Sequence, residues 1–325
     1  MNLGLIGCGY WGPNIIRNAQ KTKDINLVFC VDANPATKSK IPSGISFYTD
    51  IDEALANHQI EGVAIATPIS THYEIAKKLL LTGVNVLIQK PMAMKSEQCE
   101  ELAEIANAKK LTVMVAHTFL FTASVRKLKE LIDSGSIGDL RHFDSVRANL
   151  GLFQRDSDVV WDLAPHDLSI LSYLTANKEL EFVSAVGASH TDKNNSDVVN
   201  ISIKYRDGFS AHIHISWFSP IKVRQITLCG NDKMVVYDDN KPSEKIMIYD
   251  KSVKYEDSVF DYRSGDMYCP KLNEKEAIQE ELQHFCDCIS NKAECISGPE
   301  LGKKVVKLIE AVSQSIKLNG APIYV

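Results

Sequence analysis

Three ionisable side chains interrupt the apolar stretch VVWDLAPHDLSIL at residues 159–171. They are Asp162, His166 and Asp167, and burying such groups is costly unless each has a partner or a function. At 100° per residue of a helix, Asp162 and His166 lie one turn apart on a stripe away from the leucines. A carboxylate one turn before a histidine can fix its tautomer and raise its basicity, which suits a general acid or base.

Asp167 falls instead on the apolar arc of the same helix. We therefore interpret it as structural and expect a buried partner, such as backbone N–H groups of a neighbouring loop. Pro165 is tolerated in a first helical turn, so the helix is predicted to begin near Leu163. Asp162 then has the alternative role of an N-cap, which does not exclude contact with a substrate. The alternative for His166 is a structural histidine.

A glycine-rich loop, GCGYWG, opens the chain after a short apolar run. Gly7, Gly9 and Gly12 have the G-x-G-x-x-G spacing, which permits a tight turn, close approach of a pyrophosphate and close packing of helix on strand. Asp32 ends the next strand, where a carboxylate can hydrogen-bond ribose hydroxyls and repel a 2′-phosphate. The pattern predicts a dinucleotide site that favours NAD over NADP. The alternative is a plain glycine turn beside a strand-end aspartate.

Two further strand ends carry polar residues, ATPISTH at 66–72 and IQKP at 88–91. Ligands of open α/β sheets bind at the carboxyl ends of the strands. Lys90 therefore lies where a nicotinamide and its substrate would meet, and the following Pro91 favours an extended backbone there. The alternative is an ordinary solvated lysine.

The elements that position these residues alternate between strand and helix in residues 1–118. Strands are predicted at 3–7, 25–32, 62–67, 84–89 and 111–117, and helices at 12–21, 52–57, 71–83 and 95–110. Near-continuous apolar strands between helices indicate a parallel sheet covered on both faces. The fold class is therefore α/β, with an N-terminal doubly wound dinucleotide-binding domain over 1–118.

The pattern changes in residues 119–325. A helix at 124–135 is followed by the segment with His166 and by strands that have no helices between them. These strands are predicted at 140–150, 181–190, 197–205, 210–218, 223–230 and 233–238, with helices at about 274–290 and 299–318. We predict a C-terminal α+β domain with an open, largely antiparallel sheet, whose free face suits a substrate or another subunit.

Composition excludes several classes of protein. The 325 residues are 45% hydrophobic with a net charge of −5 and no basic block, so nothing favours nucleic acid or a membrane surface as a partner. The N-terminus does not resemble a signal peptide, and we expect a cytoplasmic protein. The eight cysteines lack paired spacing, and Cys286 and Cys288 at i, i+2 on a helix point apart, so no metal site is predicted. His212 and His214 alternate on one strand and share a face, which favours a subunit interface over metal.

Cationic residues and an aromatic residue occur in the stretches before and after the segment that contains His166. They fit a phosphorylated, nucleotide-linked sugar, and the alternative is surface charge on loops. The candidate substrate residues from RANLGLFQRD and WFSPIKVR are Arg147, Asn149, Arg155, Trp217, Lys222 and Arg224.

The order GxGxxG, Asp, ATPxxxH, xKP and WDLAPHD resembles the glucose-fructose oxidoreductase / inositol dehydrogenase / MocA family over nearly the whole chain. The likeness is strongest to members that act on nucleotide-linked sugars, the sugar 3-dehydrogenases and 3-ketoreductases. The family's usual Glu-Lys-Pro is Gln89-Lys90-Pro91 here, so the lysine is retained and the glutamate's charge is absent.

The resemblance implies a Rossmann fold, NAD as cofactor and homodimers or homotetramers. It implies that Lys90 contacts cofactor and substrate, and that His166, paired with Asp162, is the general acid/base on a sugar hydroxyl or ketone. The cofactor-side positions that it implies are Thr67, Pro68, His72, Tyr10 and Trp11. We expect a nicotinamide-dependent sugar oxidoreductase. The alternatives are oxidation of a free sugar or cyclitol, and a non-catalytic dinucleotide-binding regulator.

Overall fold

The computed structural model describes residues 1–325 except 152, 154–156 and 193–194, and the chain forms two compact units. The first unit comprises Met1–Phe121 and Lys275–Lys307, and the second comprises Thr122–Glu274 and Leu308–Val325. In the part of the chain that is described, none of the helices has the length and hydropathy of a membrane span.

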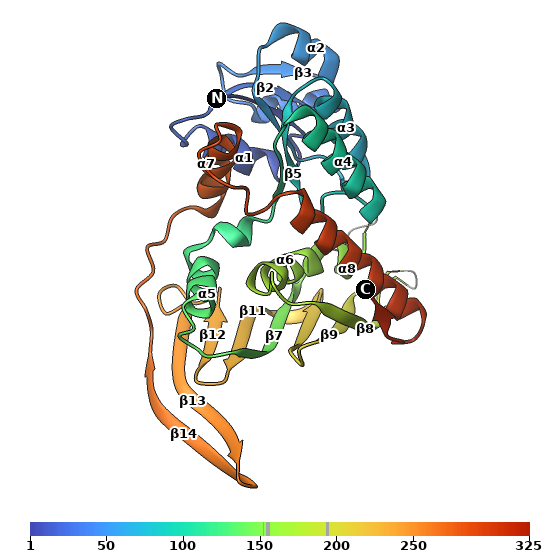
Figure 1. The fold of residues 1–325 in the computed structure, drawn as a ribbon. Coiled ribbons are helices and arrows are strands. Elements are labelled where there is room, and N and C mark those ends of the chain that lie inside the picture. The colour runs from blue at the N-terminus through green and yellow to red at the C-terminus, as the bar shows by residue number, and fades with distance from the viewer. Residues whose placement is uncertain (152, 154–156, 193–194) are drawn as a thin grey trace. The chain divides into compact units, whose positions relative to one another are not determined.

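A six-stranded parallel sheet forms the centre of the first unit (Figure 1). The strand order is β3-β2-β1-β4-β5-β6, so the direction of winding reverses between β1 and β4 and the predicted doubly wound sheet is confirmed. The strands are β1 (Asn2–Ile6), β2 (Asn26–Val31), β3 (Ser46–Tyr48), β4 (Gly62–Ile65), β5 (Asn85–Gln89) and β6 (Val113–Ala116). The short edge strand β3 was not predicted.

Helices cover this sheet on both faces, with α3 beside α4 on one face and α1 beside α7 on the other (Figure 1). The helices and 3-10 turns are α1 (Gly12–Ala19), η1 (Pro35–Lys40), α2 (Ile51–Asn57), η2 (Ile69–Thr71), α3 (His72–Leu81), α4 (Ser96–Lys109), η3 (Thr118–Phe121) and α7 (Ala277–Ile289). The central strands are almost wholly buried, as their continuous apolar runs require.

The predicted division into 1–118 and 119–325 differs from the two compact units at residues 275–307. This segment packs with the first unit because α7 lies against α1 and η3. The ring of Phe285 approaches β4 so closely that a Cβ on Gly62 would lie 2.9 Å from it. Sequence order alone does not show that a late helix returns to the first unit.

A buried carboxyl group lies where α7 meets η3. Glu281 is 1% exposed, and the hydroxyl of Thr118 donates to both of its carboxyl oxygens at 3.1 and 3.2 Å. Burial raises the pKa of Glu281 to about 8, against the opposing effect of the Thr118 hydrogen bond. The folded chain therefore holds this group protonated at neutral pH.

The free energy of unfolding of the wild type is expected to fall with rising pH through this group. The unfolded carboxyl ionises near 4.5 and the folded one near 8, so stability falls by about 1 kcal/mol per pH unit between these values. Glu281→Gln keeps an oxygen that accepts from Thr118 and cannot ionise, so its advantage over the wild type should grow with pH. Urea unfolding of both proteins across this range measures the difference, and parallel pH profiles would contradict the burial effect.

A nine-stranded sheet forms the second unit in the order β14-β13-β12-β11-β7-β10-β9-β8-β15. Among the described strand pairs, β7–β10 is parallel and the others are antiparallel, which confirms the open, largely antiparallel sheet. The strands are β7 (Leu140–Leu150), β8 (Leu180–Ala188), β9 (Val198–Tyr205), β10 (Ser210–Ser216), β11 (Phe218–Gly230), β12 (Met234–Asp238), β13 (Ile246–Glu256), β14 (Val259–Tyr268) and β15 (Ile323–Tyr324).

Helix α6 (Val159–Leu174) packs on β7, β9 and β10 beside α5 (Ala123–Asp133). Alternate residues of β10, among them Ile213 and Ile215, are buried, whereas His212 and His214 lie on the other face and are less buried. The prediction that both histidines share one face is confirmed. The long helix α8 (Pro299–Lys317) contributes its last residues to this unit.

The predicted start of α6 near Leu163 is wrong. The helix begins at Val159, and the carboxylate of Asp158 caps it by accepting the N–H groups of Val160 and Trp161 at 3.0 and 3.1 Å. Pro165 therefore lies inside the helix. Its missing N–H costs one helical hydrogen bond, and the capped first turn and the buried apolar face stabilise the helix around it.

The β13–β14 hairpin was not predicted either. Its turn is Asp257–Ser258, where both residues have positive φ, +50° and +65°, the backbone of a type I′ turn. The usual signal for such a turn is Asn-Gly or Asp-Gly, which is not present at residues 257–258. Strand β14 is exposed along its whole length, so burial imposes no clear alternation on its sequence.

Candidate functional site

The loop between β1 and α1 has the backbone geometry for which its three glycines are needed. Gly7 has a φ of +97°, and a Cβ there would lie 2.5 Å from the backbone of Ala66. A Cβ on Gly12 would lie 2.8 Å from the carbonyl oxygen of Gly7, so helix and strand lie very close together. Among the described atoms, none lies within 4 Å of a Cβ built on Gly9, which leaves space for a ligand against the backbone.

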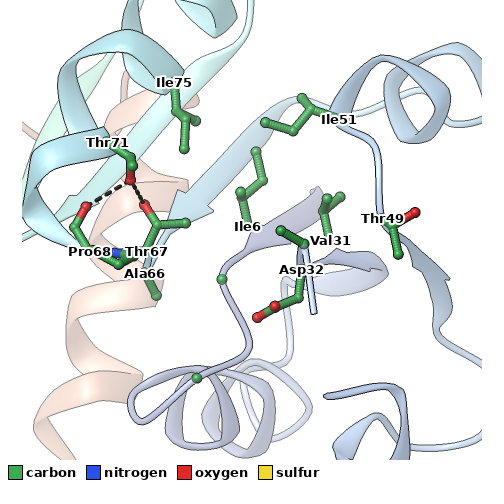
Figure 2. A pocket seen from close by; sticks show the side chains of 13 residues that line it. Ile6, Val31, Asp32, Thr49, Ile51, Ala66, Thr67, Pro68, Thr71 and Ile75 are labelled. Carbon is green, nitrogen blue, oxygen red and sulfur yellow. Dashed lines mark hydrogen bonds between the residues drawn. The ribbon is translucent and has the colours of Figure 1, made fainter. Parts of the chain in front are cut away.

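A pocket of ≈ 310 Å³ lies beside this loop, at the carboxyl ends of β1, β2 and β4 (Figure 2). The residues predicted to bind the cofactor that line it are Gly7, Gly9, Asp32, Thr67 and Pro68. Sequence reasoning did not assign the other lining residues, Ile6, Val31, Ala33, Thr49, Ile51, Ala66, Thr71 and Ile75. Figure 2 shows the apolar side chains of Ile6, Ile51 and Ile75 pointing into the same space. The feature of the sequence that could have identified these lining residues was their position at the ends of strands and the beginnings of helices.

The Asp32 carboxylate is held by two backbone donors. The N–H of Cys8 donates to one oxygen at 2.7 Å and the N–H of Asn34 to the other at 2.9 Å. Within the glycine loop, Tyr10 and Trp11 are exposed, with their rings in an edge-to-face pair at 5.9 Å. These two aromatic side chains are accessible to a ligand at the start of α1.

His72 connects the loops that follow β4 and β5. It is 1% exposed, and its two ring nitrogens lie 2.9 Å from the carbonyl oxygens of Thr67 and Pro91. Burial lowers the pKa of His72, and the charge of Lys90 lowers it further against the two carbonyl contacts. A neutral imidazole can donate to one carbonyl at a time. This placement makes His72 a support of the two loops rather than part of the pocket wall.

Lys90 directly follows β5, as predicted, and its peptide bond to Pro91 is cis. His117 directly follows the neighbouring strand β6 and is 1% exposed. Burial lowers the pKa of His117 to about 3, and the charge of Lys90 contributes to this shift. His117 is therefore a neutral ring at neutral pH. Sequence reasoning assigned it no role, although a histidine at a strand end was a signal.

In the second unit, α6 carries Asp162 and His166 one turn apart, and both are half-buried. The indole N–H of Trp217 donates to the Asp162 carboxylate at 3.0 Å. Trp217 is 1% exposed, and its ring lies so near Gly151 that a Cβ there would be 2.4 Å away. Because Asp158 is the N-cap, the capping alternative for Asp162 is excluded. Trp217, predicted to contact substrate, orients Asp162 instead.

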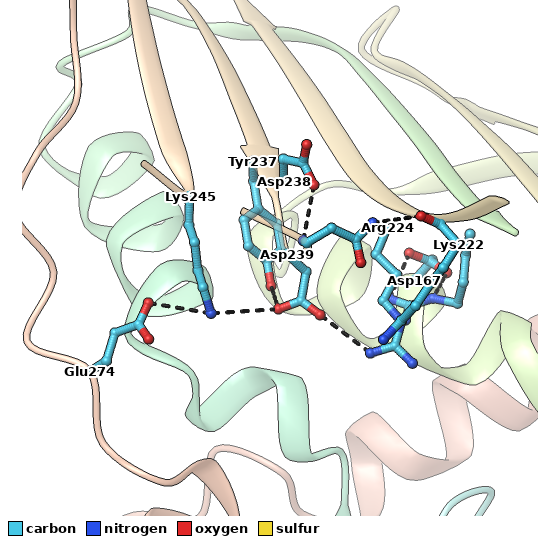
Figure 3. A network of polar contacts seen from close by, with 10 residues as sticks. Asp167, Lys222, Arg224, Tyr237, Asp238, Asp239, Lys245 and Glu274 are labelled. Carbon is cyan, nitrogen blue, oxygen red and sulfur yellow. Dashed lines mark hydrogen bonds and ion pairs between the residues drawn. The ribbon is translucent and has the colours of Figure 1, made fainter. Parts of the chain in front are cut away.

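Arg147 was also predicted to bind substrate, but it is 4% exposed and paired with Asp167. Its Nε and Nη2 donate to the two carboxylate oxygens at 2.6 and 3.2 Å, and the hydroxyl of Ser145 donates at 2.7 Å. The structural interpretation of Asp167 is thus confirmed, with side chains of β7 as partners rather than backbone N–H groups. Figure 3 shows the neighbouring network, in which Arg224 pairs with Asp239 at 3.3 Å.

Of the remaining candidate substrate residues, Lys222 is exposed on β11, and Asn149 and Arg155 come from β7 and the segment after it. Asn149 is half-buried near the end of β7. Arg155 lies outside the described residues.

Two family models match the chain, one within each of the two units. Residues 1–117 match the family model described as "Oxidoreductase family, NAD-binding Rossmann fold", and residues 125–236 match the GFO/IDH/MocA C-terminal domain. The chain belongs to the GFO/IDH/MocA family. The family resemblance and the fold class predicted from the sequence are confirmed.

Individual GFO/IDH/MocA relatives are distant in sequence. The chain is 26% identical over 240 residues to UDP-N-acetylglucosamine 3-dehydrogenase of Acidithiobacillus ferrooxidans, covering 73% of this chain and 74% of that protein. It is 28% identical over 158 residues to an uncharacterised oxidoreductase of Streptococcus pneumoniae, covering 49% of this chain and only 42% of that protein. The solved structure of GenD2 from gentamicin A biosynthesis, in complex with NAD, shares the fold at a TM-score of 0.85 and 18% identity, over 100% of this chain and 96% of that chain.

Proposed function

We propose that this chain is an NAD(H)-dependent oxidoreductase that interconverts a secondary alcohol and a ketone of a sugar. We further propose that the sugar is linked to a nucleotide and reacts at its 3-position. The observation that carries the proposal is the pocket in which Gly7, Gly9 and Asp32 meet at the carboxyl ends of β1 and β2, in a chain of an oxidoreductase family. The relative from Acidithiobacillus ferrooxidans, named a UDP-N-acetylglucosamine 3-dehydrogenase, supports the substrate class.

The residues of the pocket fit the parts of NAD. Gly9 leaves its backbone open to a pyrophosphate, and the N-terminus of α1 adds N–H groups and a partial positive charge. Asp32 would accept from the adenosine ribose hydroxyls, and Ile51 and Ile75 would contact the adenine. When bound, NAD supplies the acceptor or donor of the hydride.

The protein's own contribution to the reaction is proton transfer and stabilisation of charge. His166 would take the hydroxyl proton during oxidation and return it during reduction. Asp162, which the Trp217 indole N–H holds in place, would orient His166 and stabilise its protonated form. The ammonium of Lys90 would stabilise the charge that develops on the substrate oxygen. These roles rest on the sequence motifs and on acid–base chemistry.

Two of the residues predicted from the sequence to bind substrate are left out of the proposed contacts to the nucleotide. Arg147 and Trp217 are buried and hold Asp167 and Asp162, so they act as positioning residues. The remaining candidates are Asn149, Arg155, Lys222 and Arg224.

The proposed substrate class is tested by thermal shift. UDP- and dTDP-sugars are compared with free glucose and free inositol, each with and without NADH. We expect the melting temperature to rise with a nucleotide-sugar, and to rise further when NADH is also present. A shift with inositol or glucose alone would favour a free sugar or cyclitol as substrate. Stabilisation by NADH that no sugar increases would favour a dinucleotide-binding regulator.

Asp32→Ser is expected to change the choice of cofactor. Loss of the carboxylate removes an acceptor for the ribose hydroxyls and the repulsion of a 2′-phosphate, so the ratio of the NADP and NAD dissociation constants should shift towards NADP by about tenfold or more. Isothermal titration with both cofactors measures the ratio. Asp24→Ser, elsewhere in the first unit, is the control, and an unchanged ratio in Asp32→Ser would remove Asp32 from the ribose site.

We also propose that the chain forms homodimers or homotetramers through the open face of the nine-stranded sheet. This face carries His212, exposed beside Asp144 and His142. Light scattering on the purified protein tests the assembly. His212→Glu should weaken it by placing a negative charge next to Asp144, and a wild type that is monomeric throughout would overturn the proposal.

A further inference from the structure

Two cysteines and a histidine that the proposed reaction does not use gather in the first unit. They are His284 and Cys288 of α7 and Cys295, which follows that helix. One ligand atom from each lies within 4.8 Å of the other two, and the thiol of Cys288 is 3.4 Å from Nε2 of His284. Both cysteines are free thiols, Cys288 buried and Cys295 half-buried, and they form no disulfide.

Local structure holds this cluster together. His284 and Cys288 are one helical turn apart, so their side chains share one face of α7. The chain then reverses through Asn291, which has a φ of +56°. The hydroxyl of Ser297 donates to the backbone of β6 and fixes the returning segment. The ring of Phe121 packs at 5.4 Å from that of His284.

We propose that His284, Cys288 and Cys295 bind one Zn²⁺ ion. Two thiolates and an imidazole are the donors that zinc prefers, and three protein ligands leave a fourth position for water or a small ligand. Bond lengths of about 2.3 Å to sulfur and 2.0 Å to nitrogen in a tetrahedral site place the ligand atoms roughly 3.5–3.8 Å apart. The separations in the cluster fit this requirement after small side-chain adjustments.

The tautomer of His284 agrees with the site. The N–H of Ile296 donates to Nε2 at 3.2 Å, so this nitrogen carries the lone pair that a metal needs, and that lone pair is directed at the N–H. Zinc must displace this N–H from the lone pair. The bound ion would tie the end of α7 to the segment before α8, independently of the oxidoreductase reaction.

A second group of possible ligands in the described part of the chain provides a control. His142, Asp144 and His212 also lie within 4.8 Å of one another, but on the open sheet face of the second unit and with a carboxylate in place of the thiols. Metal at that group would show no bond to thiolate. The two groups are therefore distinguishable by spectroscopy as well as by substitution.

The test is titration of the reduced chain of residues 1–325 with Co²⁺ and then Zn²⁺. We expect a thiolate-to-cobalt charge-transfer band that saturates at about one equivalent and disappears when zinc is added. Cys288→Ser, Cys295→Ser and His284→Gln should each weaken or abolish the band. Cys286→Ser, on the same helix outside the cluster, and His212→Asn should retain it. Circular dichroism verifies that each variant is folded.

A second measurement needs no variant. Zinc should slow alkylation of Cys288 and Cys295 in the wild type, mapped by mass spectrometry, and leave alkylation of the exposed Cys269 unchanged. The proposal is overturned if the wild type shows no thiolate–cobalt band, if all three cluster variants keep the band, or if His212→Asn removes it. Formation of a Cys288–Cys295 disulfide by reduced protein exposed to air in excess zinc would also overturn it.

Discussion

Replacing His166 by asparagine is expected to lower turnover by about 10²–10⁴-fold while NAD binds with unchanged affinity, because the loss of a general acid/base removes proton transfer and not cofactor binding. Turnover is followed by reduction of NAD with the nucleotide-sugar that gives the largest thermal shift. Cofactor affinity is measured separately by titration. His190→Asn, at a histidine of the second unit that pairs with Asp197, is the matched control and should keep near wild-type turnover.

A second substitution tests the role of Asp162, because the indole N–H of Trp217 holds its carboxylate in place. Trp217→Phe keeps an aromatic ring and removes the donor, so kcat should fall with little change in KM if Asp162 acts by orienting His166. If His166→Asn kept wild-type turnover, the assignment of the acid/base would fail, whatever the result for Trp217.

Asp167→Asn is expected to reduce the free energy of unfolding by about 3–5 kcal/mol, because it leaves the guanidinium of Arg147 buried without its carboxylate. The pair is almost wholly enclosed between β7 and α6. Urea unfolding measures the loss. Asp162→Asn, at a half-buried position of the same helix, should cost less stability and more activity.

A double variant separates the ion pair from simple loss of packing. Arg147→Met combined with Asp167→Leu removes both charges and should be more stable than Asp167→Asn alone. If Asp167→Asn unfolded at the same urea concentration as the wild type, the buried pair would not be structural.

Much of the first unit was predictable because its strands are buried on both faces and because each glycine of the loop after β1 meets a specific steric requirement. The alternation of apolar runs and helices predicted the doubly wound sheet, and the spacing of Gly7, Gly9 and Gly12 predicted the phosphate-binding loop. The return of α7 was not predictable, because its packing on α1 and η3 joins residues more than 150 positions apart. Ile51 and Ile75 of the pocket were missed because they belong to no motif and only their places at the start of α2 and in the first turn of α3 indicate them.

The second unit was less predictable where side chains find partners across the sheet. The spacing on α6 separated Asp162 from Asp167 correctly, but it could not show that Arg147 on β7 is the partner of Asp167. Pro165 predicted a later helix start because proline is favoured in a first turn, whereas the carboxylate of Asp158 caps the helix earlier and the helix continues through the proline. The His284, Cys288 and Cys295 cluster combines one helical turn with a loop reversal, a geometry that cysteine spacing does not encode.

The most direct measurement of the central claim is the formation of NADH when the wild-type chain is incubated with NAD and a panel of UDP- and dTDP-sugars. We expect the absorbance of reduced nicotinamide to rise with at least one nucleotide-sugar, and only when protein, NAD and sugar are present together. If the protein binds NAD by titration but neither reduces it with any of these sugars nor oxidises NADH with their 3-keto forms, the proposal of a nucleotide-sugar oxidoreductase is contradicted.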